Sequence, residues 1–213
     1  MTTIVLVRHG QTEWNRDGRF RGRSDVALDP VGRAQAQACA RRIAAGWRPS
    51  AVYSSPLSRA VHTAQPIAEQ QGLKVSVRQH LIDLNFGDWE GLKLSEARLR
   101  WPDLVDGWLG DPGSVRPPRG EGLETLRERA LAEVRSLARA HAEETIVVVS
   151  HDALNRVLVL AALDAPLGAF FRVGQDTAAI NVLSVDEQGI VVEVVNDTCH
   201  LQPASSQETP DAR

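Results

Sequence analysis

Three short apolar runs, each followed by a helical pattern, constrain the fold of this chain more than any other feature. They are Ile4–Val7, Ala51–Tyr53 and Ile146–Val149, and each is apolar at consecutive rather than alternate positions. Strands that helices cover on both faces have this pattern, because neither face meets water. The runs therefore predict an α/β fold, a three-layer α/β/α sandwich with a mostly parallel central sheet.

The segments around these runs have the spacing of helices and of further strands. Four segments are predicted to be helical, namely residues 31–45, 57–71, 122–142 and 153–163. Two later strand patterns, Ile180–Val185 and Ile190–Val195, flank a turn at Glu187–Gly189. Strand and helix thus alternate along most of the chain, as the sandwich requires.

Two segments depart from this alternation. Residues 84–121 are rich in Gly, Pro and Trp, and we expect them to form a small inserted subregion over one edge of the sheet. Residues 202–213 have no apolar side chain larger than Pro or Ala, which is typical of a disordered tail. We expect residues 1–201 to form a single domain, since a chain of 213 residues can build one sizeable core.

The composition argues against several classes of function. A net charge of −3 gives the chain no general attraction to nucleic acid or to an anionic membrane. Cys39 and Cys199 are too few for a disulfide framework, and as free thiols they indicate a cytoplasmic location. The run Ile4–Val7 ends at Arg8, which makes it too short for a signal peptide or a spanning helix. We expect a cytoplasmic protein with no nucleic-acid or membrane partner.

Histidines and arginines follow the three apolar runs. In sheets of this type, ligands bind beyond the carboxyl ends of the strands. The first run is followed by Arg8 and His9, the second by Ser54–Arg59 and the third by Ser150–His151. A guanidinium group can bind two phosphate oxygens at once through two parallel hydrogen bonds, and an imidazole can attack phosphorus or donate a proton. Two histidines and two arginines at one edge therefore predict a site for a phosphorylated ligand.

Four sequence blocks occur in a fixed order and cover most of residues 4–160. They are Leu6–Thr12 with Asn15 and Arg21–Gly22, then Ser54–Ala64, Phe86–Gly91 and Val149–His151. Together they resemble the signatures of the histidine phosphatase superfamily, the phosphoglycerate mutase-like proteins. The resemblance implies that His9 is the nucleophile and becomes a phosphohistidine after in-line attack. It assigns binding of the phosphoryl group to six residues, Arg8, Asn15, Arg21, Gly22, Arg59 and His151.

The sequence departs from this family at the position of the acid that would protonate the leaving oxygen. The phosphatase branch usually has a glutamate there, and this chain has Asp83. An aspartate can do the same chemistry with a shorter side chain, so we assign the role to Asp83 and keep Glu90 and Asp88 as alternatives. Asp152 also departs from the family, and it either orients His151 and favours its protonated form or only caps a helix.

The resemblance implies a metal-independent phosphatase that hydrolyses a small phosphorylated metabolite. A cofactor-dependent phosphoglycerate mutase is the main alternative, but mutases resemble one another in a longer insertion, where this chain has Phe86–Gly91. A non-catalytic phosphate-binding protein is a second alternative, which the retention of Arg8, His9, Arg59 and His151 disfavours. The sequence lacks zinc-ligand and nucleotide-binding motifs, so we expect no metal and no organic cofactor. Homodimers are common among the proteins that the sequence resembles.

Overall fold

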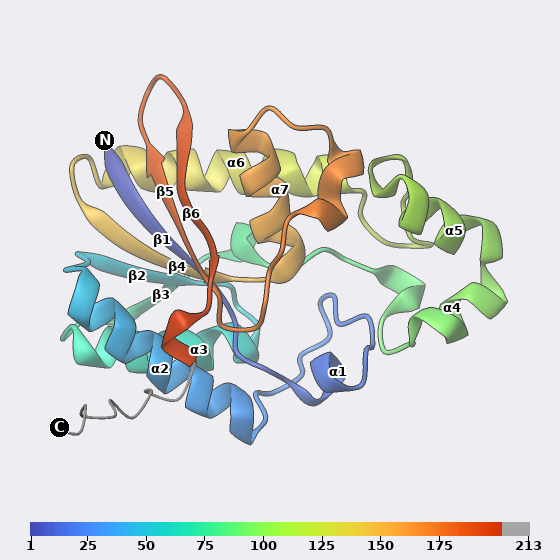
Figure 1. The fold of residues 1–213 in the computed structure, drawn as a ribbon, viewed down its shortest axis with the longest axis horizontal. Coiled ribbons are helices and arrows are strands. Elements are labelled where there is room, and N and C mark those ends of the chain that lie inside the picture. Colours follow the sequence, from blue (N-terminus) through green and yellow to red (C-terminus); the bar gives the residue numbers. More distant parts are fainter. Residues whose placement is uncertain (202–213) are drawn as a thin grey trace, which may run out of the picture.

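The structure is a computed structural model and describes residues 1–201. Within this range it contains a six-stranded sheet with helices on both faces (Figure 1). The strands, in spatial order, are β3 (Val75–Val77), β2 (Ala51–Ser54), β4 (Thr145–Ser150), β1 (Thr2–Arg8), β5 (Ile180–Val185) and β6 (Ile190–Asp197). Neighbours from β3 to β1 run parallel, whereas β5 and β6 are antiparallel to their neighbours. The predicted α/β fold with a mostly parallel sheet is confirmed, although the short edge strand β3 was not predicted.

The side chains of β1 alternate between two apolar cores on opposite faces of the sheet. Four helices cover these faces, namely α2 (Pro30–Gly46), α3 (Ser58–Gln70), α6 (Leu123–Ala140) and α7 (Asp152–Ala162). Ile4 and Leu6 are fully buried in one core with side chains of α6 and α7. Val5 and Val7 are fully buried in the other core with side chains of α2 and α3. Burial on both faces is the reason that the run is apolar at consecutive positions.

The inserted subregion contains two short helices and shares the main apolar core. These helices are α4 (Leu94–Arg100) and α5 (Pro102–Gly110), at the right of Figure 1. Trp89 and Trp108 are 0% and 4% exposed, and they belong to the same core as Leu6. This shared core supports the expectation of a single domain over residues 1–201, which stays a prediction. The predicted disordered tail, residues 202–213, lies outside the described residues.

A close backbone contact fixes the segment that follows β1. A Cβ atom added to Gly10 would lie 2.5 Å from the carbonyl oxygen of Gly32, and one added to Gly32 would overlap the carbonyl oxygen of Gln11. Only glycine allows the two backbones to approach this closely. The first turn of α2 therefore packs directly against the segment that carries His9. Among the helices of residues 1–201, none combines the length and apolar composition needed to cross a membrane.

Candidate active site

The structure brings together the five residues that the sequence predicts to be catalytic. Arg8 is the last residue of β1 and His9 follows it, Arg59 lies in the first turn of α3, and His151 is at the N-cap of α7. Asp83 comes from the loop that precedes the inserted subregion. The exposed fractions of all five lie between 0% and 6%. The carboxyl ends of the parallel strands thus carry a buried cluster of charged and titratable side chains, as expected for this sheet type.

The imidazole of His9 is held in one orientation and one tautomer. Its Nδ1 donates a hydrogen bond to the carbonyl oxygen of Gly10 at 2.7 Å, because a carbonyl can only accept. The lone pair of the neutral ring is therefore on Nε2, which is buried and has no hydrogen-bond partner within residues 1–201. Burial, with the positive charges of Arg59 and Arg8, holds the pKa of His9 well below its ordinary value. His9 thus presents a neutral nitrogen nucleophile.

His151 and Asp83 lie side by side next to His9. The imidazole rings of His9 and His151 are 5.2 Å apart between centroids. His151 Nε2 lies 2.7 Å from Ser55 Oγ, and its Nδ1 lies 3.8 Å from Asp83 Oδ2. Burial raises the pKa of Asp83 even though Arg59 opposes the shift, so this carboxyl group retains its proton to a higher pH than an exposed aspartate. Burial and Arg59 also lower the pKa of His151.

Three arginines make the cluster strongly cationic. Arg59 donates hydrogen bonds to the carbonyl oxygens of Gly22 at 2.7 Å and Ser24 at 2.8 Å, and Arg8 donates to the carbonyl oxygen of Gln175. Burial and the nearby Arg8 lower the pKa of Arg21 to about 10. The Nε atoms of these three arginines are buried and have no hydrogen-bond partner among the described residues. An oxyanion placed between them would satisfy these donors, as buried polar groups require.

Asp152 has a role that neither sequence interpretation anticipated. Its carboxylate lies 2.5 Å from Arg156 Nε, 3.8 Å from Arg8 Nη1 and 3.9 Å from Arg21 Nη2. Burial alone would raise the pKa of Asp152, but Arg8 and Arg156 lower it, so the group stays ionised. Asp152 therefore holds three guanidinium groups in place, and it is His151 that occupies the capping position of α7.

The two alternative acids make contacts away from the two histidines. Glu90 accepts a hydrogen bond from Ser24 Oγ at 2.7 Å, and Asp88 forms an ion pair with Arg119. Asp83, by contrast, lies 3.4 Å from Arg59 Nη2 in addition to its contact with His151. Of the three carboxylates, Asp83 is the one in the cluster.

Gly22 contacts the cluster through Arg59, Asn15 lies in the segment that follows His9, and binding of the phosphoryl group by either residue stays a prediction. Asn15 belongs to the short helix α1 (Glu13–Arg16), where its Oδ1 accepts hydrogen bonds from the backbone nitrogen and the hydroxyl of Thr12 at 3.0 and 2.7 Å. Within residues 1–201, no hydrogen bond joins Asn15 to the cluster. Gly22 has a φ of +52°, which favours glycine, and it contributes the carbonyl oxygen that orients Arg59.

An ion pair that the sequence analysis missed holds the segment before Asp83. Arg129, on α6, donates hydrogen bonds to the carbonyl oxygens of His80, Ile82 and Asp83 at 2.7–2.9 Å. The same guanidinium group binds both carboxylate oxygens of Glu121, at 2.8 and 2.9 Å. Helical spacing assigns Arg129 only to a polar face, and no local signal shows that this face meets a loop.

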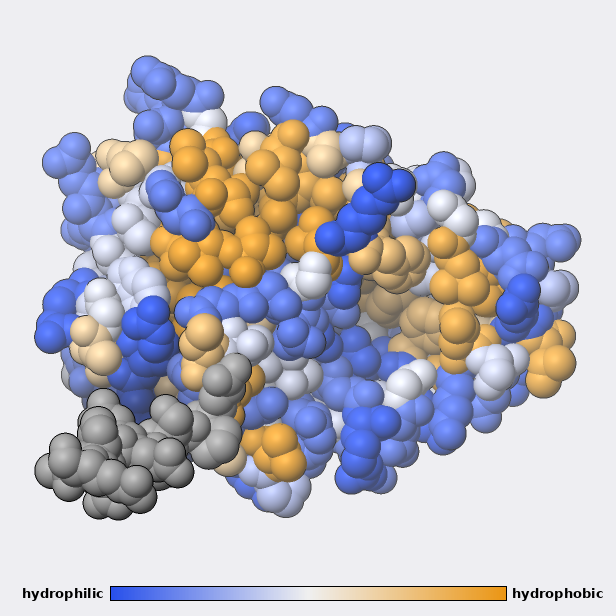
Figure 2. Space-filling model, in the orientation of Figure 1, coloured by the Kyte–Doolittle hydropathy of each residue, from blue (hydrophilic) through white to orange (hydrophobic). Residues whose placement is uncertain are grey.

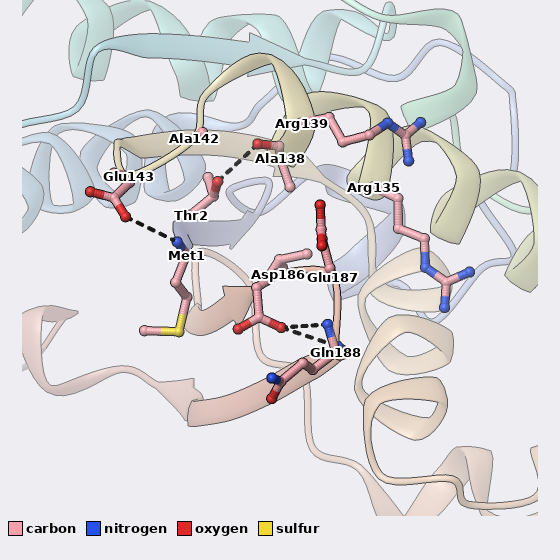
Figure 3. A pocket seen from close by; sticks show the side chains of 12 residues that line it. Met1, Thr2, Arg135, Ala138, Arg139, Ala142, Glu143, Asp186, Glu187 and Gln188 are labelled. Carbon is pink, nitrogen blue, oxygen red and sulfur yellow. Dashed lines mark hydrogen bonds and ion pairs between the residues drawn. The ribbon is translucent and has the colours of Figure 1, made fainter.

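A separate cavity lies at the other end of β1, away from the cluster. Its volume is about 710 Å³, and its lining includes Met1, Thr2, Arg135 and Arg139 (Figure 3). Strand β1 rises about 3.3 Å per residue, so Thr2 lies roughly 20 Å from the strand end that carries His9. In Figure 3, the amino terminus lies 4.0 Å from Glu143 and the hydroxyl of Thr2 donates a hydrogen bond to the carbonyl oxygen of Ala138 at 2.9 Å, whereas Arg135 and Arg139 are drawn without such a contact.

The fold and the cluster together define an α/β protein with a buried, cationic, two-histidine anion site. Residues 4–198 match the family model of the histidine phosphatase superfamily, branch 1. The chain therefore belongs to this superfamily, and its class of reaction is the hydrolysis of phosphoric monoesters.

Individual relatives support this assignment. Phosphoserine phosphatase 1 of Hydrogenobacter thermophilus is 33% identical over 201 residues, which cover 94% of this chain and 95% of that protein. The structure of YhfR from Bacillus stearothermophilus has a TM-score of 0.89 and 30% identity, covering 95% of this chain and 100% of its own. The structure of a phosphoserine phosphatase mutant of Entamoeba histolytica, in complex with phosphoserine, has a TM-score of 0.85 and 29% identity, covering 95% of this chain and 100% of its own.

We predict that Arg129→Met loosens the segment before Asp83. The substitution removes the donor that binds three carbonyl oxygens of this segment, and it leaves the carboxylate of the largely buried Glu121 without its main partner. The free energy of unfolding should therefore fall by about 2–4 kcal/mol. The displaced segment should also lower kcat/KM for a phosphate ester roughly 10- to 100-fold. Urea denaturation and phosphate release measure the two effects. Arg127→Met, on the same helix, is the control, because Arg127 pairs with Glu124 at the surface. Equal effects of the two substitutions would contradict this role of Arg129.

Proposed function

We propose that this chain hydrolyses small phosphate esters by two successive in-line transfers, with His9 as the nucleophile and Asp83 as the acid and base. The observation that carries this proposal is the buried Nε2 of His9, an unpartnered lone pair beside three arginines and a protonatable carboxyl group. Membership of the histidine phosphatase superfamily supports it.

In the first transfer, the Nε2 lone pair of His9 forms a bond to phosphorus as the bond from phosphorus to the leaving oxygen breaks. Asp83, in its protonated form, gives its proton to that oxygen, so an alcohol departs and a carboxylate remains. Arg8, Arg59 and His151 bind the phosphoryl oxygens, and the positive charges of the two arginines with the N–H donors of all three residues stabilise the transition state. Asp152 acts through the arginines, because it fixes the guanidinium group of Arg8.

In the second transfer, water attacks the phosphohistidine on the face that the alcohol has left. The Asp83 carboxylate accepts the proton of the water, the bond from phosphorus to Nε2 breaks, and inorganic phosphate is released. A mutase would share the first transfer and then give the phosphoryl group to a second hydroxyl. The identity of the acceptor, water or alcohol, is therefore the test that separates these two activities.

We predict that the wild-type protein releases inorganic phosphate from small phosphate esters with EDTA present. His9→Ala should abolish turnover and phosphohistidine labelling, and Asp83→Asn should slow release by a factor of about 10² or more. His62→Ala is the control, since His62 lies on α3 and lines a separate cavity next to α2. If the wild-type protein releases phosphate from none of the esters, the proposal is overturned. Transfer only to added alcohols would favour the mutase.

We predict a bell-shaped dependence of kcat/KM on pH, with His9 setting the acid limb and Asp83 the alkaline limb. The acid limb follows protonation of His9, whose pKa is lowered, so activity persists as the pH falls below the ordinary range of histidine. The alkaline limb follows ionisation of Asp83, whose raised pKa keeps the acid form above the ordinary range of aspartate. Asp83→Asn should lack the alkaline limb. The two profiles are compared as the ratio of wild type to variant with one substrate, because the ionisation of the substrate cancels in that ratio. A ratio that does not fall on the alkaline side would assign the acid to another group.

We also propose a cytoplasmic homodimer. The free thiols of Cys39 and Cys199 support the location. Strand β6 is at the edge of the sheet and exposes Val191, Val194 and Val195, with fractions between 37% and 57%. Figure 2 shows apolar atoms gathered on the face where Figure 1 draws β6. An edge strand with apolar side chains is a surface that pairing with a second copy would cover.

We predict that Val195→Lys converts a dimer into a monomer, because it places a charge on the apolar edge strand. Light scattering after gel filtration should give about twice the chain mass of 23.3 kDa for the wild type and one chain mass for the variant. Leu99→Lys is the control, since Leu99 is 86% exposed on α4. A wild type that remains monomeric at high concentration would exclude the dimer.

A further inference from the structure

A second cavity opens beside the cluster and has a mainly apolar wall. Its volume is about 280 Å³, and it shares Arg21, Asp83 and Asp152 with the anion site. Seven of its other lining residues are large and apolar, namely Phe20, Phe86, Leu94, Trp108, Leu109, Phe170 and Phe171. These come from the loop after α1, from the inserted subregion and from a 3-10 turn over Leu167–Arg172. The cavity therefore joins a cationic side to an aromatic side.

The aromatic wall is held in place by contacts between its own rings. The ring centroids of Phe20 and Phe86 are 5.0 Å apart, and those of Phe86 and Trp108 are 5.6 Å apart. Phe171 packs edge-on against Trp108 at 5.9 Å. Trp108 is 4% exposed, whereas Phe171 is 48% exposed and keeps an accessible surface at the mouth. Edge-on and tilted aromatic pairs of this kind give a preformed apolar wall.

Arg19 and Asp152, two of the charged groups around this cavity, already have partners within the protein, and the unpartnered Nε of Arg21 lies on the cationic side that the phosphoryl group takes. Arg19 donates a hydrogen bond to the carbonyl oxygen of Gly91 at 2.7 Å and lies 3.5 Å from Glu96. Asp152 is engaged by Arg156, Arg8 and Arg21. An ammonium or carboxylate group that entered the apolar side would lose water without gaining a free counter-charge, which is costly. An apolar group would gain free energy from the same burial.

The position of Asp83 connects this cavity to the reaction. Asp83 lines the cavity and is the group that protonates the leaving oxygen, so the carbon skeleton of the leaving alcohol extends from Asp83 along the aromatic wall. We propose that this site takes phosphate esters of aromatic or bulky apolar alcohols in preference to esters of amino acids or hydroxy acids. The inference rests on the proposed function. A ring fits, because a cavity of roughly 150 Å³ suffices for benzene.

The test compares three primary alkyl phosphates, so that the reactivity of the leaving group is nearly matched. They are 2-phenylethyl phosphate, ethyl phosphate and phosphoserine. We expect kcat/KM for the phenylethyl ester to exceed that for each of the other two by about tenfold or more, because a pocket that buries a ring discriminates by this amount. Comparable hydrolysis of phosphoserine would overturn the preference and leave the proposed function standing. Hydrolysis of none of the three would overturn both.

Substitutions in the aromatic wall locate the preference. Phe171→Ser and Leu109→Ser change lining residues that are 48% and 44% exposed, so both variants should fold. Each should lower the ratio of kcat/KM between phenylethyl and ethyl phosphate several-fold, because each removes apolar surface from the wall. Leu99→Ser, at a position that is 86% exposed on α4, should leave this ratio unchanged. A ratio that neither wall substitution alters would show that the ring binds elsewhere and overturn the inference.

Discussion

Burial of the Arg59 guanidinium group is the constraint on which the site depends. The side chain is fully buried, and a buried cation must be paired or hydrogen-bonded to remain tolerable. Arg59 therefore binds the carbonyl oxygens of Gly22 and Ser24 and the carboxylate of Asp83, three groups from two segments far apart in the sequence. Satisfying one arginine in the first turn of α3 thus brings the loop after α1 and the proposed acid to the same edge of the sheet.

The same arrangement gives each titratable group the protonation state that phosphoryl transfer needs. Burial penalises charge, so it lowers the pKa of His9 and raises the pKa of Asp83. The nearby arginines reinforce the shift of His9 and oppose that of Asp83. A neutral nucleophile and a protonated acid can therefore coexist in one range of pH. Asp152 stays ionised because three arginines lie against it, and its negative charge offsets part of the positive charge that they concentrate at the anion site.

What the sequence could predict is what local patterns encode. Consecutive apolar residues predicted the strands β1, β2 and β4, and the residues that follow them predicted the cluster, because strand ends in a parallel sheet share an edge. Arg129 and the arginine contacts of Asp152 were missed, since they join segments whose proximity depends on tertiary packing. Binding of the phosphoryl group by Asn15 comes from the family pattern and stays a prediction: Thr12 engages the side-chain oxygen of Asn15, and the side-chain nitrogen makes no hydrogen bond within residues 1–201.

The chemistry and the proposed selectivity come from different parts of the chain, and Arg156 connects them. The anion site is built from strand ends, whereas the aromatic wall comes from the inserted subregion and the 3-10 turn after α7. Arg156 lies 2.5 Å from Asp152 and donates a hydrogen bond to the carbonyl oxygen of Phe170 at 3.0 Å. Its guanidinium group also stacks 5.2 Å from the Phe170 ring centroid. Arg156 therefore ties the position of the aromatic wall to the carboxylate that holds the arginines of the anion site.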